Sequence, residues 1–445
     1  MPRRPRPTPD PWLVVSDAEG NLFEVPQYLA LGRSGGTTVR AHPEQFAPLP
    51  EGSLIFHLPG RKPVGFDPRL GRAVTVEEVD GRPVFAAAAF LAPAHTALFL
   101  APWQRQPGVQ PLPLYCYAAL GFRDGVFVSP CLRVDPDRRQ DPVLFDQQEI
   151  DAGAARMRER FPGNRVVDHI VGNCALTYCC PAARNFCLNR WEAPIPTSPA
   201  CNSDCVGCIS LQKDGKIPVT QPRLDFVPSP EEIAEMAVFH LETAPGPVVS
   251  FGQGCEGEPL LQAERIEAAI RLIRRRTGAG TININTNASK PEAVKRLVDA
   301  GLDEIRISIN ACRSELYARY YRPHKYTIDD VAASGRAVAE AGGHVSMNYL
   351  MFPGISDDEA EFAAFEDFAA QAGVRRVQMR NLNLDPDHYL RALGLPPDLP
   401  PGFGIDRWVR RAQRALPHLR FGYFNPPRED WGPPWPGAAV AGRNS

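Results

Sequence analysis

Long apolar runs are missing from this sequence. No stretch approaches the roughly 18 apolar residues that a membrane-spanning helix needs. The opening residues, MPRRPRPTPD, are basic but have no apolar segment behind them, which does not match a secretory signal. We therefore expect a soluble, cytoplasmic protein that does not act at a membrane.

An excess of charge of one sign is also missing. Lys and Arg together number 49 and Asp and Glu 51, which gives a formal net charge of −2. A chain with this balance has no bulk attraction to nucleic acid or anionic lipid. The sequence therefore gives no clear nucleic-acid signal. Its 445 residues suffice for two to three domains of roughly 150 residues each.

Cysteine is absent beyond Cys312 but abundant before it. There are 11 cysteines, and seven of them fall between residues 174 and 208. A disulfide scaffold is usually a short secreted chain, whereas a tight cysteine group in a large chain is typical of metal or catalytic chemistry. We therefore look for a metal centre in this region.

Residues 1–165 differ in pattern from the rest. Short apolar runs lie between Pro and Gly residues, at 11–15, 52–58, 82–91 and 124–134. This pattern predicts a β-rich accessory domain, of a role that the sequence does not show. Four residues there can bind metals in principle, but we interpret them as packed or surface residues: His57, His95, Cys116 and Cys131.

From about residue 226 helical and strand patterns alternate. The predicted strands are 247–252, 281–287, 304–310, 344–352 and 375–383. The predicted helices are 229–241, 260–278, 291–301, 327–343 and 356–373. Alternation of this kind indicates a parallel sheet with helical crossovers. With one further strand just before residue 201, made irregular by its prolines, the fold class is α/β, a partial (β/α)6 TIM-like barrel.

These patterns divide the chain into four parts. We expect the β-rich domain at 1–165, a Cys-rich connector at 166–192, the α/β core at 193–390 and a Pro-rich extension at 391–445. Within the extension, residues 418–424 can add one edge strand. The last ten to fifteen residues are expected to be disordered.

The sharpest motif is C-N-S-D-C-V-G-C, in which Cys201, Cys205 and Cys208 are spaced C-x3-C-x2-C. Thiolates this close in sequence can surround one face of a compact metal centre. Three ligands are one fewer than a closed zinc site or a four-thiolate iron–sulfur site requires. Either a fourth ligand comes from elsewhere, or one metal position stays open for a substrate.

This motif resembles the cluster-binding motif of the radical SAM superfamily. The resemblance implies that the three cysteines hold a [4Fe–4S] cluster and that S-adenosylmethionine (SAM) chelates the fourth iron. One position departs from the family pattern: the residue before the third cysteine, often aromatic in the family, is Gly207.

Later segments resemble the same family in the expected order. Residues 257–259, Gly-Glu-Pro, follow the second strand and look like the family's GGEP element, with Glu256 in place of the first Gly. The ends of the next two strands are similar to family segments that contact SAM. The SAM contacts that the resemblance implies are Gly257, Glu258, Pro259, Asn287, Ser308 and Asn310. Arg380 and Asn381 end the sixth strand and are expected to face the same mouth.

The function that the resemblance implies is reductive cleavage of SAM to a 5′-deoxyadenosyl radical, which abstracts hydrogen from an unidentified substrate. Such an enzyme needs an electron donor such as a flavodoxin or ferredoxin. The lack of cysteine beyond Cys312 disfavours the C-terminal auxiliary-cluster domain of many peptide-modifying relatives. The alternative function is a non-catalytic iron–sulfur or zinc protein used for structure, sensing or electron transfer.

A second cysteine group precedes the first, with the spacing C-x4-C-C-x6-C. It can hold an auxiliary iron–sulfur cluster or zinc, but this spacing matches no metal motif, and adjacent cysteines rarely bind one ion. We therefore favour packed, unligated thiols for Cys174, Cys179, Cys180 and Cys187. Cys255 can reach the substrate mouth, but we interpret it, like Cys312, as a small buried residue.

Overall fold

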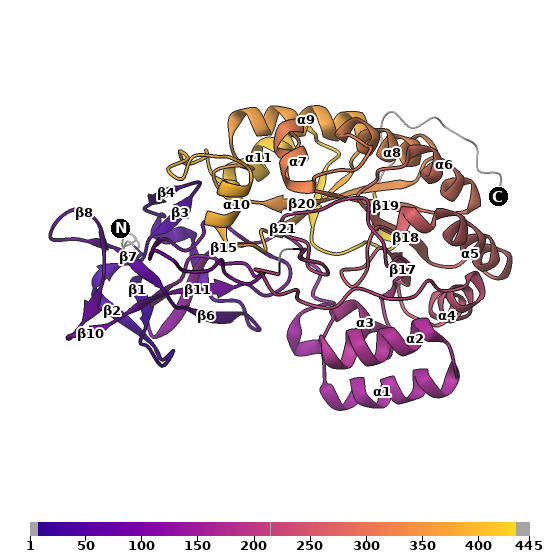
Figure 1. Ribbon diagram of the computed structural model, residues 1–445, viewed down its shortest axis with the longest axis horizontal. Coiled ribbons are helices and arrows are strands. Elements are labelled where there is room, and N and C mark those ends of the chain that lie inside the picture. The colour runs from indigo at the N-terminus through magenta and orange to yellow at the C-terminus, as the bar shows by residue number, and fades with distance from the viewer. Residues whose placement is uncertain (1–7, 214, 433–445) are drawn as a thin grey trace, which may run out of the picture. The chain divides into compact units, whose positions relative to one another are not determined.

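The computed structural model of the chain describes residues 8–213 and 215–432. They fold into two compact units, each built from separate stretches of chain (Figure 1). The first unit comprises the residues up to Asp137 together with Met351–Phe362 and Arg380–Arg411. The second comprises Arg138–Leu350, Ala363–Met379 and the residues from Ala412 on. The four-part division expected from the sequence does not follow these units, and as functional domains its parts stay predictions.

The first unit is β-rich, as predicted for the N-terminal region. Among the described residues, 11 strands form an antiparallel sheet with the central order β12-β15-β14-β1-β2-β7-β13, and β5, β6, β8 and β11 pair onto it. They are β1 (Trp12–Ser16), β2 (Leu22–Leu29), β5 (Phe46–Pro48), β6 (Leu54–Leu58), β7 (Arg61–Asp67), β8 (Arg72–Thr75), β11 (Phe85–Phe90), β12 (His95–Ala97), β13 (Trp103–Arg105), β14 (Gly121–Arg123) and β15 (Val126–Arg133). Two small pairs accompany it: β3 (Gly32–Ser34) with β4 (Thr37–Val39), and β9 (Glu78–Val79) with β10 (Arg82–Pro83).

The second unit contains a parallel sheet whose strands follow in chain order. Its strands are β16 (Glu192–Ile195), β17 (Val248–Phe251), β18 (Thr281–Thr286), β19 (Glu304–Ile309), β20 (His344–Met351), β21 (Arg376–Asn381) and β22 (Arg420–Gly422). The partial β/α barrel predicted from the sequence is confirmed, and β22 is the edge strand expected within 418–424. Because each described pair is parallel, the carboxyl ends of neighbouring strands lie at the same edge of the sheet.

Helices follow the strands as predicted. The predicted helices are α4 (Pro230–Thr243), α5 (Ala263–Arg276), α6 (Pro291–Ala300), α8 (Ile328–Glu340) and α9 (Glu359–Ala372), and α7 (Ser314–Tyr321) is an additional helix that was not predicted. Ser229 and Glu232 form a capping box at the start of α4, because each side chain accepts the other's backbone N–H. In Figure 1, α4, α5, α6 and α8 lie in a row alongside the sheet. Two further helices, α10 (Pro386–Ala392) and α11 (Ile405–Ala415), precede β22.

The β-rich region is shorter than predicted, because the chain is helical from residue 147. The elements there are α1 (Gln147–Arg160), α2 (Arg165–Asp168), the π-helix His169–Thr177 and α3 (Pro181–Cys187). Asp146 caps α1 by accepting the N–H of Glu149 at 2.9 Å. The buried side chains of Ile150, Ala154 and Met157 recur at helical spacing, a pattern that indicates a helix in the sequence itself.

Within the described residues no helix combines the length and the apolar character that crossing a bilayer requires. The disorder expected for the last residues concerns positions 433–445, which lie outside the described residues.

Candidate metal and cofactor site

The cysteine loop, residues 201–208, follows the short strand β16 and lies against the end of α7. Its backbone is held there by hydrogen bonds from the N–H of Asp204 to the carbonyl of Tyr321 and from the N–H of Val206 to the carbonyl of Tyr320, each 3.0 Å. A third bond of 2.9 Å joins the N–H of His324 to the carbonyl of Asn202. The loop is therefore held at three positions along its backbone although it has no regular secondary structure.

The three thiols of this loop are partly exposed and close enough to influence one another. Burial raises the pKa of Cys201 to about 11, and the negative charge of Glu258 adds to this. Burial also raises the pKa of Cys205 well above its ordinary value, with further contributions from Cys208 and Cys201. The charges of the three thiols thus act on one another within this short loop.

A cation faces the third thiol. The Nη2 group of Arg223 lies 3.6 Å from Sγ of Cys208, and its Nε donates to the hydroxyl of Ser210 at 3.2 Å. The side-chain amide of Gln212 donates to the carbonyl of Cys208 at 2.8 Å. These contacts hold the third cysteine in place and put a positive charge beside its sulfur.

Residues 257–259, the GEP segment, run directly against the chain that leads into the cysteine loop. The N–H of Gly257 donates to the carbonyl of Ser198 at 2.6 Å, and the N–H of Glu258 to that of Ala200 at 2.8 Å. A β-carbon at position 257 would lie 2.0 Å from the carbonyl oxygen of Ala200. Only glycine fits there, and the tight approach places the GEP segment beside Cys201.

Glu256 holds the same junction from the other side. Its buried carboxylate accepts the N–H groups of Thr197 at 2.7 Å, Ser198 at 2.8 Å and Gln253 at 2.7 Å. Burial raises its pKa to about 7 in spite of these hydrogen bonds. The residue that departs from the GGEP pattern therefore joins the end of β16 to the loop after β17, a role that sequence reasoning missed.

Glu258 joins the GEP segment to the end of β18. Its Oε2 accepts the N–H of Asn287 at 2.8 Å, while its Oε1 accepts the N–H of Leu260 at 2.9 Å and the hydroxyl of Thr286. The carboxyl group is buried, which raises its pKa to about 7. Two residues expected from the sequence to bind the same molecule are thus in direct contact.

Asn287 connects this pair to the cysteine loop. Its side-chain Nδ2 donates to Oδ1 of Asn202 at 2.8 Å and to the hydroxyl of Ser203 at 3.1 Å. Asn202 in turn donates to the hydroxyl of Ser289 at 2.9 Å. The loops after β16, β17 and β18 therefore form one hydrogen-bonded unit.

Comparison with known proteins matches this arrangement to a family. The profile described as the Radical SAM superfamily matches residues 195–365. Residues 195–365 are a radical SAM domain. The family uses a [4Fe–4S] cluster and SAM, and three half-buried thiols in one loop fit a cluster with one iron left open.

Relatives of the radical SAM domain differ widely in what they do. The chain is 27% identical over 182 residues to the FeMo cofactor biosynthesis protein NifB of Klebsiella pneumoniae, covering 37% of each chain. It is 26% identical over 163 residues to the GTP 3′,8-cyclase of Lactiplantibacillus plantarum, covering 36% of this chain and 45% of that protein. The chain thus spans less than half the length of both relatives, so neither activity carries over to it.

One solved structure is also distantly similar to this chain. Streptococcus suis SuiB bound to SAM has a TM-score of 0.37 to this chain at 16% identity, with 52% of this chain and 50% of SuiB covered. A likeness at this level says nothing about the substrate.

The other expected SAM contacts of the radical SAM domain lie at the same sheet edge. Pro259 begins a short 3-10 helix, Pro259–Gln262, that Glu258 caps. Ser308 stands near the end of β19, opposite Asn348 of β20. Asn310 directly follows β19 and is buried, with its Nδ2 donating to the carbonyl of Leu316 at 3.4 Å. Their contacts with SAM stay predictions.

Asn381, expected to face the same mouth, is engaged within the first unit. Its Oδ1 accepts the N–H of Ala97 at 2.8 Å, and its Nδ2 donates to the carbonyl of His95 at 2.9 Å. Arg380 and Asn381 both belong to that unit. Asn381 therefore has a structural role at the end of β21.

The departure at Gly207 has a physical counterpart in the fold. A β-carbon at position 207 would lie 2.6 Å from the hydroxyl oxygen of Tyr320 in α7. The radical SAM domain thus lacks an aromatic residue before the third cysteine, and an aromatic residue of a helix occupies the adjoining space instead.

The second cysteine group is divided by the fold. Cys174 is buried and its Sγ lies 3.5 Å from Sγ of Cys255, to which it is hydrogen-bonded, whereas Cys179 is exposed. The hydrogen-bonded Cys255 thiol, and next the ring of His169, lower the pKa of Cys174 below its ordinary value. Cys255 is buried as expected, and it contacts the second group rather than solvent.

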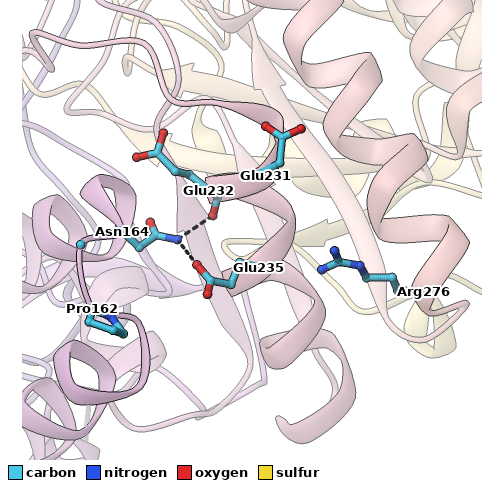
Figure 2. A pocket seen from close by; sticks show the side chains of 7 residues that line it. Pro162, Asn164, Glu231, Glu232, Glu235 and Arg276 are labelled. Carbon is cyan, nitrogen blue, oxygen red and sulfur yellow. Dashed lines mark hydrogen bonds between the residues drawn. The ribbon is translucent and has the colours of Figure 1, made fainter.

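A surface hollow of about 420 Å³ lies away from these loops, between Asn164 and α4. Figure 2 shows Asn164 bridging to Glu232 and Glu235, with Arg276 at the far side. Asn164 donates to the carbonyl of Glu232 and to Oε2 of Glu235, each at 2.9 Å. These contacts join the start of α2 to α4 and have a structural role.

Proposed function

We propose that this protein is a radical SAM enzyme. With a [4Fe–4S] cluster bound by Cys201, Cys205 and Cys208, it cleaves SAM reductively, and the resulting 5′-deoxyadenosyl radical abstracts hydrogen from an unidentified substrate. The observation that carries the proposal is the hydrogen-bonded unit in which Asn287 contacts both Glu258 and the cysteine loop. It links the loop that carries the three thiols to the buried carboxylate of Glu258.

When bound, the cluster supplies a low-potential electron, for which iron–sulfur centres reach about −700 mV. The role of the chain is to bind and orient SAM and to exclude water. Three thiolates from one loop leave one coordination position for an outside ligand. The positive charge of Arg223 beside Cys208 offsets part of the negative charge of the thiolates.

Glu258 suits the amino group of SAM. Its carboxylate accepts three hydrogen bonds from the chain, and a carboxylate offers about four acceptor positions. An ammonium group at the remaining position would favour the ionised carboxylate, which burial alone disfavours. We assign Glu258 the role of receiving this cation, with the close approach at Gly257 holding it in place.

Asn287 acts mainly by positioning. Both N–H donors of its side chain are used by Asn202 and Ser203, and its Oδ1 accepts the N–H of Ser289 at 3.1 Å. One acceptor position on Oδ1 remains for a hydroxyl donor. We assign Ser308 and Asn310 as the further polar contacts, to the ribose or carboxylate of SAM. An electron donor such as a flavodoxin or ferredoxin, and a cytoplasmic location, complete the proposal.

The proposal is tested by adding SAM to the reduced protein and recording its EPR spectrum. If the protein is a radical SAM enzyme with an open iron, we expect a clear change in the EPR signal of the cluster, since SAM binds that iron. A non-catalytic iron–sulfur or zinc protein predicts no change. Cys205→Ala should remove both the cluster absorbance and SAM cleavage. Cys116→Ala, at a buried cysteine of the first unit, is the matched control and should alter neither.

A further inference from the structure

A second group of metal-ligating side chains lies outside the cysteine loop. It comprises His169, Cys174 and Cys255, whose ligand atoms all lie within 4.8 Å of one another. His169 and Cys174 belong to the π-helix His169–Thr177, and Cys255 precedes the GEP segment. Residues 81 positions apart in the chain are thus brought to one buried place.

The winding of the π-helix is what brings His169 and Cys174 together. They are five residues apart, and an α-helix with 3.6 residues per turn would put them on different faces. Bonds from residue i to i+5 widen the turn; one of them is the 3.1 Å bond between the N–H of Tyr178 and the carbonyl of Asn173. π-helical turns are rare and are frequently found at functional sites.

The distances suit one tetrahedral ion. Zinc–sulfur bonds of about 2.3 Å put two sulfurs of a tetrahedral site about 3.8 Å apart. The sulfurs of Cys174 and Cys255 are 3.5 Å apart, whereas a disulfide bond needs about 2.05 Å. A [4Fe–4S] cluster takes one thiolate per iron, so its thiolates do not converge on a single point as these do.

The chemistry of the group also favours an ion. The Nε2 atom of His169 is buried and makes no hydrogen bond to any described residue, which costs about 1–3 kcal/mol in a protein interior. A lone pair given to a metal ion removes that cost. Two thiolates balance the charge of a divalent ion, so the site is neutral overall and can be buried.

We propose that His169, Cys174 and Cys255 bind one zinc ion. The fourth position goes to water or to the half-buried Cys180, whose backbone N–H donates to the carbonyl of Cys174 at 2.8 Å. Such a site ties the π-helix to the loop that carries the GEP segment. The inference does not depend on the proposed function, because the cysteine loop contributes no ligand to it.

The test is metal analysis of the purified full-length protein together with zinc-edge X-ray absorption. The expected content is about one zinc per chain in addition to iron, with at least two sulfurs at about 2.3 Å and one nitrogen at about 2.0–2.1 Å. A third sulfur would identify Cys180 as the fourth ligand. Because the zinc edge is element-specific, bound iron does not interfere.

Variants separate this site from the cysteine loop. Cys174→Ala and Cys255→Ala should lower zinc retention against a chelator at least tenfold, whereas Cys187→Ala, at a buried cysteine of α3, should retain it. Cys205→Ala should lose iron and keep zinc. If an alanine variant fails to fold, His169→Gln tests the same site, since the nitrogen neighbour should disappear from the zinc spectrum.

Three results would overturn the zinc proposal. One is wild-type protein that contains no zinc after growth with added zinc and takes none up from a zinc titration. Another is a thiol count that shows Cys174 and Cys255 joined in a disulfide. The third is unchanged zinc retention in both alanine variants.

Discussion

The backbone N–H of Asn287 donates a hydrogen bond of 2.8 Å to Oε2 of Glu258. Glu258 follows β17 and Asn287 follows β18, so this bond joins the ends of two neighbouring parallel strands. The side chain of Asn287 then reaches Asn202 in the cysteine loop. The site therefore depends on contacts among three loops, and each contact can be tested separately.

Asn287→Ala should weaken the attachment of the cysteine loop while leaving the backbone bond to Glu258 in place. Without the side chain of Asn287, Oδ1 of Asn202 and the hydroxyl of Ser203 each lose a hydrogen bond, which costs about 1–3 kcal/mol. We expect at least tenfold lower SAM cleavage and reduced iron content. Asn202→Ala should have a similar effect. The double variant should lose less SAM cleavage activity, as a free energy, than the sum of the losses in the two single variants. Strict additivity would contradict a shared contact.

Gly257→Ala should disturb the junction between the GEP segment and the cysteine loop. The new β-carbon would lie 2.0 Å from a backbone oxygen of Ala200, and overpacking of this kind costs about 1–3 kcal/mol or more. The measurements are the thermal unfolding midpoint and the iron content. Gly278→Ala is the control, since a β-carbon there has no neighbour within 4 Å. Equal midpoints for the two variants would refute the close approach.

The buried carboxyl group of Glu304 should make stability depend on pH. Burial raises its pKa to about 8, although Ser346 donates a hydrogen bond of 2.6 Å to it. The folded protein therefore binds this proton more tightly than the unfolded chain, whose carboxyl titrates near pH 4.3. The stability contribution is complete below that pH and is lost as the pH rises to about 8, by at most about 1.4 kcal/mol per pH unit.

Glu304→Gln tests this sign, because glutamine does not ionise. Unfolding midpoints of the wild type and the variant should be compared from about pH 5 to about pH 8, so that other titrating groups cancel in the difference. We expect the unfolding midpoint of the variant to rise relative to that of the wild type as the pH rises. A difference that stays constant over this range would show that Glu304 ionises normally.

In the first unit, Asp385→Asn should be strongly destabilising. Arg61 and Asp385 form a buried ion pair of 2.9 Å with side-chain exposures of 2% and 0%. Removing one partner leaves a buried, unpaired charge, which costs about 3–5 kcal/mol. The exposed pair of Arg40 and Asp10 offers the control: Asp10→Asn should change the unfolding free energy by less than about 1 kcal/mol. Similar losses of unfolding free energy in Asp385→Asn and Asp10→Asn would contradict the larger contribution of the buried pair.

The sequence predicted those parts of the fold that depend on local patterns. The helix that Ser229 caps and the strands that end at the site residues follow from periodicity and short spacing. The role of Glu256 could not be predicted, because its partners Thr197 and Ser198 lie almost sixty residues earlier. Sequence reasoning could register it only as a departure from a pattern.

The group of His169, Cys174 and Cys255 could not be predicted from the sequence for a similar reason. The sequence spacing groups Cys174 with the cysteines that follow it, but its side chain contacts Cys255, 81 residues later. His169 joins them only because the helix is π-wound, and no spacing rule for α-helices predicts that. The assignments of SAM contacts, in turn, stay predictions until a ligand is bound.

The most direct test of the proposed function is an assay for 5′-deoxyadenosine. The protein is reconstituted anaerobically with iron and sulfide, reduced with dithionite and supplied with SAM. We predict that the wild type forms 5′-deoxyadenosine and that the triple variant Cys201→Ala, Cys205→Ala, Cys208→Ala forms none. Equal amounts of product from both proteins, or a wild type that assembles no four-iron cluster, would contradict the account.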